Sequence, residues 1–368
     1  MNDRRQFLKG AAVVASASAL AACGKDEVQT SAGSAEPQQT FEWKMVTSWP
    51  KNFPGLGTGA NHFADLLEKM SGGRIKVKVY GSNELVGAFE VFDAVSRGTA
   101  QLGHGGSYFW SGKVPASPFF TSVPFGMNAQ EMNAWMYQGG GLELWQEAYE
   151  PFGLMPFPIG NTGVQMGGWF NKEINSLEDF KGLKMRIPGM AGEVLRRLGG
   201  TPVTLPGGEL FQALQSGTID ATEWVGPYND LAFGLYKAAK YYYAPGWHEP
   251  GSTMEAIVNK EAFESLPADL QEIVKAATRV ANMDMLADYT ASNQRALEDL
   301  INKHGVELRT FPDDLLIELK RISDEVLKEA AEKDAFTQKV YDSFMTFRAN
   351  VMKWHKVSEE SFYRARNL

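Results

Sequence analysis

Five polar side chains stand among apolar or glycine-rich neighbours and have the chemistry to recognise a small ligand: Asn161, Gln165, Arg186, Glu223 and Glu249. An arginine is the side chain best suited to hold a carboxylate, because its fork makes two parallel charge-assisted hydrogen bonds. Two carboxylates and an amide oxygen favour a hard cation such as Na⁺ or Ca²⁺. Together these groups suit a small carboxylic acid bound beside a cation that neutralises the glutamates.

Each of these residues also has a purely structural interpretation. Arg186 alone could serve a structural salt bridge, and Glu223 and Glu249 could be solvated or helix-capping carboxylates. The sequence does not show that the five side chains converge. A periplasmic metal-dependent enzyme acting on a hydroxy acid is the competing chemical hypothesis, with the glutamates as base and metal ligand.

The chain carries none of the familiar catalytic signatures. It has no Gly-x-Ser-x-Gly elbow, P-loop, Gly-x-Gly-x-x-Gly or His-Glu-x-x-His motif. Its five histidines are dispersed without metal-ligand spacing, and we expect each to be a surface or internally satisfied residue. The sequence therefore favours binding over catalysis.

Composition narrows the class of protein further. The 368 residues are 44% hydrophobic and 22% charged, which excludes wholesale disorder and allows two domains or one large one. A net charge of −8 argues against a nucleic-acid partner. The single cysteine, Cys23, excludes an internal disulfide and a cysteine metal cluster.

The first residues indicate export. Arg4 and Arg5 precede an uncharged, alanine-rich run that is shorter than the roughly 20 residues of a membrane-spanning helix. The start resembles a twin-arginine signal, and Leu20-Ala21-Ala22-Cys23 resembles a lipobox, in which Cys23 would be lipidated. Cys23 could instead be incidental to an ordinary signal-peptidase site. Removal of residues 1–22 would take the net charge from −8 to about −10.

The elements that must position these residues follow an α/β pattern. We predict a strand over 41–47, then a helix, a strand over 75–79 and a helix over 88–97, which favours a mainly parallel sheet. Residues 92–101 resemble residues 211–220, and this echo could reflect two lobes of related design or chance. No glycine or proline interrupts 268–304, so we expect one long helix there.

The end of the chain is also helical in pattern, over 312–333 and from about 334 to 363. Six residues form an apolar stripe close to helical spacing: Phe336, Val340, Phe344, Phe347, Val351 and Trp354. This stripe must be buried, either on the protein's own body or in a partner subunit.

In its site motifs the chain resembles the solute-binding proteins of tripartite ATP-independent periplasmic (TRAP) transporters, the DctP family, and within them the subgroup that binds 2-oxo acids and related monocarboxylates. The matching motifs are 161–170, 182–186, 217–228 and 241–246. The resemblance implies a two-lobed, periplasmic-binding-protein-like α/β fold with a hinge, a long lobe-spanning helix and a C-terminal helical extension. The domains expected are a signal peptide (1–22), a flexible tether (23–40), lobe I (41–163 with about 253–300), lobe II (164–252 with about 301–333) and a C-terminal helix available for dimerisation (334–368).

The resemblance also implies roles for single residues. Arg186 would pair with the ligand's carboxylate, Asn161 would bond the ligand and Tyr108 would cover it. A cation, Na⁺ in preference to Ca²⁺, would be held by Gln165, Glu223, Glu249 and the main-chain oxygen of Trp224. One local departure is His248, where the resemblance leads us to expect an aromatic residue after Trp247.

The partners implied are a small carboxylate and the membrane subunits of a TRAP permease. The protein would be a periplasmic receptor and not an enzyme, attached to the membrane only through a lipid on Cys23. A homodimer is expected from exchange of C-terminal helices, although packing on the same chain would also bury the stripe. A sensor that presents its ligand to a receptor is a further alternative.

Overall fold

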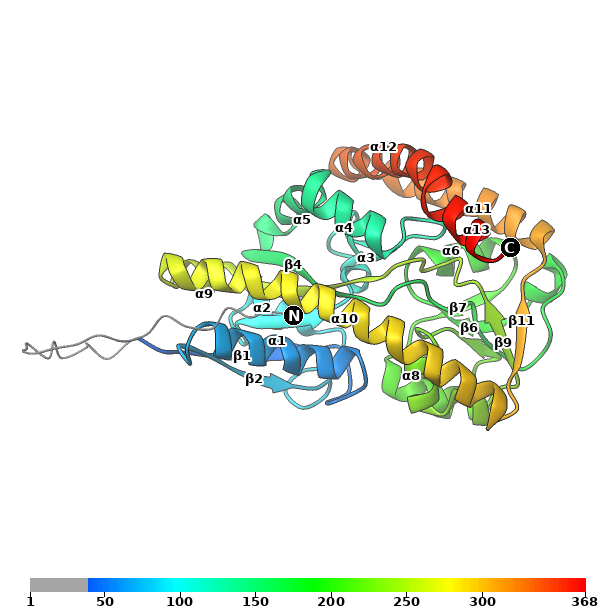
Figure 1. The fold of residues 1–368 in the computed structure, drawn as a ribbon, viewed down its shortest axis with the longest axis horizontal. Coiled ribbons are helices and arrows are strands. Elements are labelled where there is room, and N and C mark those ends of the chain that lie inside the picture. Colours follow the sequence, from blue (N-terminus) through cyan, green and yellow to red (C-terminus); the bar gives the residue numbers. More distant parts are fainter. Residues whose placement is uncertain (1–38) are drawn as a thin grey trace, which may run out of the picture. The chain divides into compact units, whose positions relative to one another are not determined.

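The computed structural model describes residues 39–368, and these residues form two β-sheets surrounded by helices (Figure 1). The predicted signal peptide and Cys23 lie outside the described residues. Within residues 39–368, none of the helices is both long and apolar enough to cross a membrane. The α/β prediction is confirmed.

The first sheet has five strands, one of which runs opposite to the others. Strand β10 pairs antiparallel with both of its neighbours, β3 and β4, whereas β1 pairs parallel with β2 and β3. In spatial order the strands are β2 (Ile75–Tyr80), β1 (Phe41–Thr47), β3 (Leu102–Gly105), β10 (Thr253–Asn259) and β4 (Leu154–Asn161).

The second sheet has six strands and also contains one reversed strand. Strand β5 pairs antiparallel with both β8 and β9, and the other pairs are parallel. In spatial order the strands are β11 (Glu307–Thr310), β9 (Tyr241–Ala244), β5 (Gly168–Phe170), β8 (Ala221–Thr222), β6 (Lys184–Arg186) and β7 (Thr201–Val203). Each sheet is thus mainly parallel, as expected, with one exception.

Two short segments carry the chain between the sheets. Residues 162–167 lead from β4 to β5, and residues 245–252 lead back from β9 to β10. Both segments hold residues that the sequence singled out, Gln165 in the first and Glu249 in the second. The hinge region and the candidate site therefore share the same stretches of chain.

A third crossing is made by the long helix α10 (Ala268–Asn302), which confirms the predicted helix. Its first half buries Leu270 and Val274 in the core beside the first sheet. Its second half buries Tyr289 and Leu300 in the core that contains strands β5 and β9 of the second sheet. At roughly 1.5 Å per residue its 35 residues span about 52 Å, enough to run past both sheets (Figure 1).

Helix–glycine–strand joins occur at both places where the sequence echoes itself. Helix α2 (Val91–Ser96) is followed by Gly98, and α7 (Leu210–Gln215) by Gly217. The φ angles of these glycines are 74° and 73°, a left-handed conformation that glycine adopts at little cost. Helix α2 is shorter than predicted because residues 87–90 form a turn, in which the Gly87 amide donates to Glu90 Oε2 at 2.7 Å.

The C-terminal helices pack on different parts of the body. Helix α11 (Asp313–Ala331) contacts α6 (Gly189–Arg197), beside the second sheet. Helix α12 (Ala335–Val357) contacts α3 (Pro118–Thr121), α4 (Ala129–Gln138) and α5 (Gly141–Tyr149). Val340 and Phe344 are fully buried there, with the ring of Phe344 5.2 Å from that of Trp135. The first part of the apolar stripe is therefore buried on its own chain.

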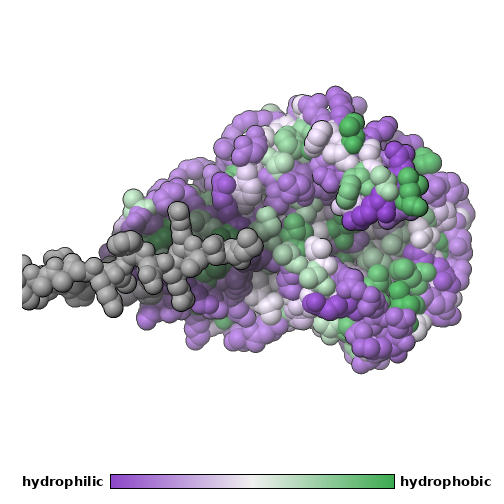
Figure 2. Space-filling model, in the orientation of Figure 1, coloured by the Kyte–Doolittle hydropathy of each residue, from purple (hydrophilic) through white to green (hydrophobic). Residues whose placement is uncertain are grey.

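The last part of this stripe remains on the surface. The predicted single helix is broken at Ser358, after which α13 (Glu359–Arg366) begins. Trp354, Val357 and Phe362 are 63%, 70% and 57% exposed. On the face shown in Figure 2, hydrophobic residues interrupt the hydrophilic surface near the end of the chain.

The remaining elements complete the two halves. They are the helices α1 (Leu56–Met70), α8 (Pro227–Phe233) and α9 (Lys260–Glu264) and the 3₁₀ turns η1 (Ser107–Trp110), η2 (Glu150–Phe152), η3 (Leu177–Phe180), η4 (Gly207–Glu209) and η5 (Leu235–Lys237). The residue boundaries predicted for the two lobes stay a prediction.

Candidate functional site

The two segments that cross between the sheets run side by side and are joined by backbone hydrogen bonds. The amide of Gln165 donates to the carbonyl of Glu249 at 3.2 Å, and the amide of Gly246 donates to the carbonyl of Gln165 at 2.8 Å. These bonds hold residues 80 positions apart in the sequence at one place. Gln165 and Glu249, both expected at the cation site, therefore lie side by side.

Strand ends of the second sheet bring Arg186 and Glu223 together. Arg186 is the last residue of β6 and Glu223 directly follows β8, and these strands are parallel neighbours whose carboxyl ends share one edge. The guanidinium and the carboxylate form an ion pair, with Arg186 2% and Glu223 0% exposed. Arg186 Nε also donates to the carbonyl of Leu205 at 3.2 Å, and its guanidinium carbon lies 5.1 Å from the Trp224 ring.

The Gln165 amide supports the second carboxylate. Its Nε2 donates to Glu249 Oε2 at 2.9 Å, to Ser252 Oγ at 3.1 Å and to Thr162 Oγ1 at 3.2 Å. Ser252 Oγ donates to the same oxygen of Glu249. Within residues 39–368, Gln165 Oε1 is buried and has no hydrogen-bond partner. The amide is therefore held by its nitrogen, which leaves a buried acceptor oxygen available.

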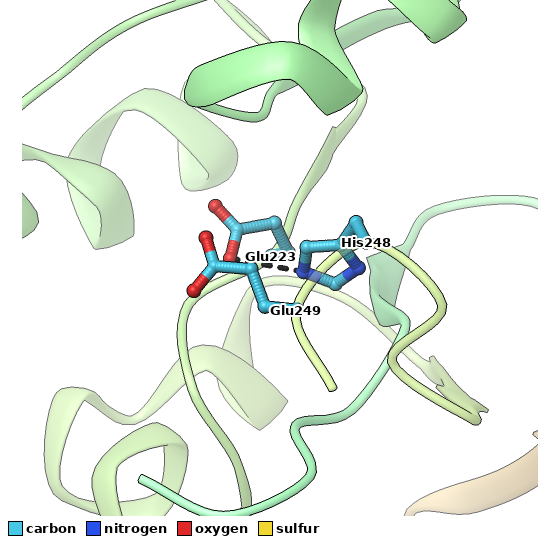
Figure 3. A group of neighbouring side chains, drawn as sticks. All are labelled: Glu223, His248 and Glu249. Atoms are coloured by element: carbon cyan, nitrogen blue, oxygen red, sulfur yellow. Dashed lines mark hydrogen bonds and ion pairs between the residues drawn. The ribbon is translucent and has the colours of Figure 1, made fainter. Parts of the chain in front are cut away.

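The carboxylates of Glu223 and Glu249 lie close together, with the imidazole of His248 beside them (Figure 3). One potential ligand atom from each of these residues lies within 4.8 Å of the others. Burial raises the pKa of Glu249 to about 7, and the nearby charge of Glu223 adds to the effect. Two buried carboxylates and an orphaned amide oxygen form a donor set that fits a hard cation.

Tyr108 comes from the other half of the molecule and lines a narrow cavity together with Gln165 and Arg186. It lies on η1, next to the first sheet, and is 8% exposed. Burial raises the pKa of its hydroxyl, with the charges of Glu249 and Glu223 as further causes. The same narrow cavity is lined by Trp49, Leu56, Tyr108, Gln165, Arg186, Trp224, Val225 and Met254.

Asn161 ends β4 and uses its side chain to fasten the crossing segments. Its Nδ2 donates to the carbonyl of Gly251 at 3.3 Å and to Thr253 Oγ1 at 3.2 Å, and its Oδ1 accepts from the amide of Gly163 at 2.9 Å. It is not among the residues that line the cavity. A direct bond from Asn161 to a ligand stays a prediction.

The contact between His248 and Glu223 was not foreseen from the sequence. The histidines were expected to be surface or internally satisfied residues. His248 is buried, 1% exposed, with its Nε2 3.3 Å from Glu223 Oε2, and its Nδ1 has no partner within residues 39–368. The signal available in the sequence was its position next to Glu249, where an aromatic residue was expected.

Asp230 is a second unforeseen residue, because in sequence it is an ordinary acidic residue in the first turn of α8. It accepts hydrogen bonds from Tyr242 Oη at 2.7 Å, from Trp169 Nε1 at 3.0 Å and from the amide of Val225 at 3.3 Å. Burial raises its pKa to about 7. Asp230 thereby fixes the backbone just after Glu223 and Trp224.

Known proteins resemble this chain in both sequence and fold. Residues 45–334 match the family described as bacterial extracellular solute-binding protein, family 7. The chain belongs to this family. Residues 1–21 also match the twin-arginine translocation signal, which indicates export of this family 7 protein to the periplasm.

Two kinds of relative extend the match. A monocarboxylate 2-oxoacid-binding periplasmic protein of Nostoc sp. is 46% identical over 360 residues, which cover 98% of this chain and 97% of the relative. A TRAP solute-binding protein of Pseudoalteromonas atlantica, solved with bound sodium and pyruvate, has a TM-score of 0.86 at 44% identity, covering 89% of this chain and 99% of that one. A TRAP solute-binding protein of Colwellia psychrerythraea, solved with calcium and pyruvate, has the same TM-score and identity and covers 89% of this chain and 100% of that one. The two-lobed fold expected from the sequence is confirmed, and this chain is a TRAP-type solute-binding receptor.

Proposed function

We propose that this receptor captures a small 2-oxo or 2-hydroxy monocarboxylate such as pyruvate, together with a metal cation, and does not transform it. The observation that carries the proposal is the convergence of four polar side chains. Arg186 and Gln165 line one cavity, Arg186 pairs with Glu223, Gln165 donates to Glu249, and the two carboxylates lie close together. The pyruvate in the two related structures supports the choice of acid.

Each side chain then has one task in binding. Arg186 pairs with the acid's carboxylate, Asn161 bonds the ligand and Tyr108 covers it. The cation ligands are Gln165, Glu223, Glu249 and the main-chain oxygen of Trp224. A bound cation would neutralise the buried carboxylates and supply positive charge for the acid's oxygens. Na⁺ is our proposed cation, in line with the subgroup that the sequence resembles, and related structures hold either sodium or calcium.

Capture follows from the two-lobed architecture. The site lies on the segments that join the two sheets, so a hinge motion there would open the cleft and admit the acid in its water shell. Arg186 and the glutamate cluster replace that water, and closure brings Tyr108 over the acid. An acid of the wrong shape would leave buried polar groups unpaired, which provides specificity. The closed receptor would then deliver the acid to the membrane subunits of a TRAP permease.

We also propose a lipid anchor on Cys23 and a homodimer. The lipobox-like sequence before Cys23 supports the anchor. The exposed apolar residues Trp354, Val357 and Phe362 support a dimer that uses α12 and α13.

The decisive experiment is titration calorimetry with pyruvate in buffers containing Na⁺, Ca²⁺ or neither. We expect tight binding with Na⁺ and a large loss without either cation. NMR should recover the acid unchanged after long incubation. Binding that is indifferent to cations would contradict the assigned cation site, tight binding only with Ca²⁺ would correct the choice of ion, and turnover of the acid would overturn the receptor function.

A further inference from the structure

We propose that His248 is a positioning residue that holds the carboxylate of Glu223 in the orientation needed to bind the cation. The proposal rests on the proposed function in that it assigns Glu223 to the cation. It goes beyond it because His248 is not one of the expected ligands.

The hydrogen-bond partners of His248 define which ring nitrogen carries the proton. His248 Nε2 lies 3.3 Å from Glu223 Oε2, and an ionised carboxylate only accepts hydrogen bonds. We therefore assign the proton to Nε2, which donates it to Glu223. Among residues 39–368, Nδ1 is buried without a partner, so the described protein offers no acceptor for a proton on that nitrogen. In this arrangement His248 acts as a donor to the carboxylate and not as a cation ligand through Nε2.

The two glutamates of the cluster are held in the same way. Each has its Oε2 held by a neighbour, since Glu223 Oε2 faces His248 and Glu249 Oε2 accepts from Gln165 and Ser252. The other oxygen of Glu223 meets Arg186. Figure 3 shows the two carboxylates together, with the dashed contact of His248 on one of them.

Holding Oε2 matters because Arg186 contacts only Oε1. The second contact fixes the plane of the Glu223 carboxylate before a cation binds. Partners that orient metal ligands in this way typically contribute 10- to 100-fold to metal affinity. A phenylalanine at position 248 would place an aromatic ring there without a donor for Glu223. His248 therefore distinguishes this chain's site by a hydrogen bond and not by its ring shape.

A pair of substitutions separates the hydrogen bond from packing. His248→Phe keeps an aromatic ring but removes the donor, whereas His248→Gln keeps an amide N–H near the position of Nε2. With Ca²⁺ alone as the probe in calorimetry, we expect His248→Phe to weaken binding 10- to 100-fold and His248→Gln to stay within about threefold of the unchanged protein. Unchanged Ca²⁺ affinity in His248→Phe, or equal weakening in both variants, would overturn the proposal.

A second measurement does not depend on any ligand. ¹⁵N NMR of the histidine rings in cation-free protein should show the Nε2–H tautomer for His248, whose signals are assigned by their disappearance in His248→Gln. An Nδ1–H tautomer would overturn the proposal even if His248→Phe failed to fold. Failure of the proposed function would look different, because the unchanged protein would then bind neither cation nor pyruvate while the tautomer remained Nε2–H.

Discussion

Arg186 and Glu223 form a buried ion pair at the ends of two adjacent parallel strands. The backbone reinforces their proximity, because the amide of Glu223 donates to the carbonyl of Arg186 at 3.2 Å. Arg186, which we assign to the ligand's carboxylate, thus forms an ion pair with Glu223, which we assign to the cation. Changes at either residue should affect ligand binding and folding together.

Replacement of Arg186 tests the role of the guanidinium. We expect Arg186→Ala to weaken pyruvate binding at least 100-fold in calorimetry, because the buried anion would lose its charge-assisted bonds. The variant should also lose about 3–5 kcal/mol of unfolding free energy, since Glu223 would be left buried without its partner. Arg186→Lys keeps the charge but not the fork, and we expect intermediate affinity.

A double variant separates these two effects of Arg186. Arg186→Met with Glu223→Gln removes both charges at similar volume, so denaturant unfolding should return most of the lost stability. Pyruvate binding should remain absent. Recovery of binding along with stability would show that Arg186 serves only the fold.

Stability should depend on pH through Glu249. Its pKa is about 7 in the folded protein and 4.5 for the ordinary group, so the folded state binds more protons between these values. Without cation, unfolding free energy should therefore fall as pH rises from about 4.5 to about 7 and then level off, with up to about 3 kcal/mol at stake. Urea unfolding at pH 5 and pH 8 measures this loss.

The matched control for that pH effect is Glu249→Gln. Asp230 and Glu255 also have pKa values raised by burial, to about 7 and about 8, and they contribute a loss of the same sign. The informative quantity is thus the pH dependence of unfolding free energy in the unchanged protein minus that in Glu249→Gln. This difference should shrink when Ca²⁺ is added. An identical pH slope in Glu249→Gln would contradict the assignment.

The two ends of helix α12 should serve different purposes. The buried residue Phe344 should stabilise the fold, and the exposed residue Trp354 should contribute to the dimer interface. Phe344→Ala should cost about 3–5 kcal/mol, because the fully buried ring packs on Trp135 and Phe119. Trp354→Glu, at a site 63% exposed, should change stability by less than about 0.5 kcal/mol but abolish the dimer in analytical ultracentrifugation. Ile317→Glu, 70% exposed on α11, is the control. If the Trp354→Glu variant still forms a dimer, the interface lies elsewhere on the protein.

Cys23 should decide how the exported protein is retained. The unchanged protein is expected to enter the detergent phase of a Triton X-114 extraction, and Cys23→Ala to move to the aqueous phase. A paired Arg4→Lys and Arg5→Lys variant serves as the export control, with unprocessed precursor expected in the cytoplasm. Equal partitioning with and without Cys23 would mean that this cysteine carries no lipid.

Local patterns predicted several of the helices and strands, including the longest helices. Alternation located β2 (Ile75–Tyr80), and the absence of glycine and proline located α10. The break at Ser358 was missed, because the residues on both sides of it are helical in pattern and Ser358 itself has no strong breaking tendency. The reversed strands β5 and β10 were missed because strand direction depends on where the chain crosses between sheets.

The sequence by itself determined the types of donor in this protein: a guanidinium, two carboxylates and an amide in apolar company, with the helices and strands that carry them. Only the tertiary structure decided that these groups meet, because Gln165 and Glu249 are joined by pairing of the crossing segments and Arg186 and Glu223 by the order of strands in a sheet. His248 shows the limit most clearly. Its neighbour in sequence is Glu249, but its hydrogen-bond partner is Glu223, 25 residues earlier. Such long-range contacts depend on how the whole chain packs, and no local periodicity encodes them.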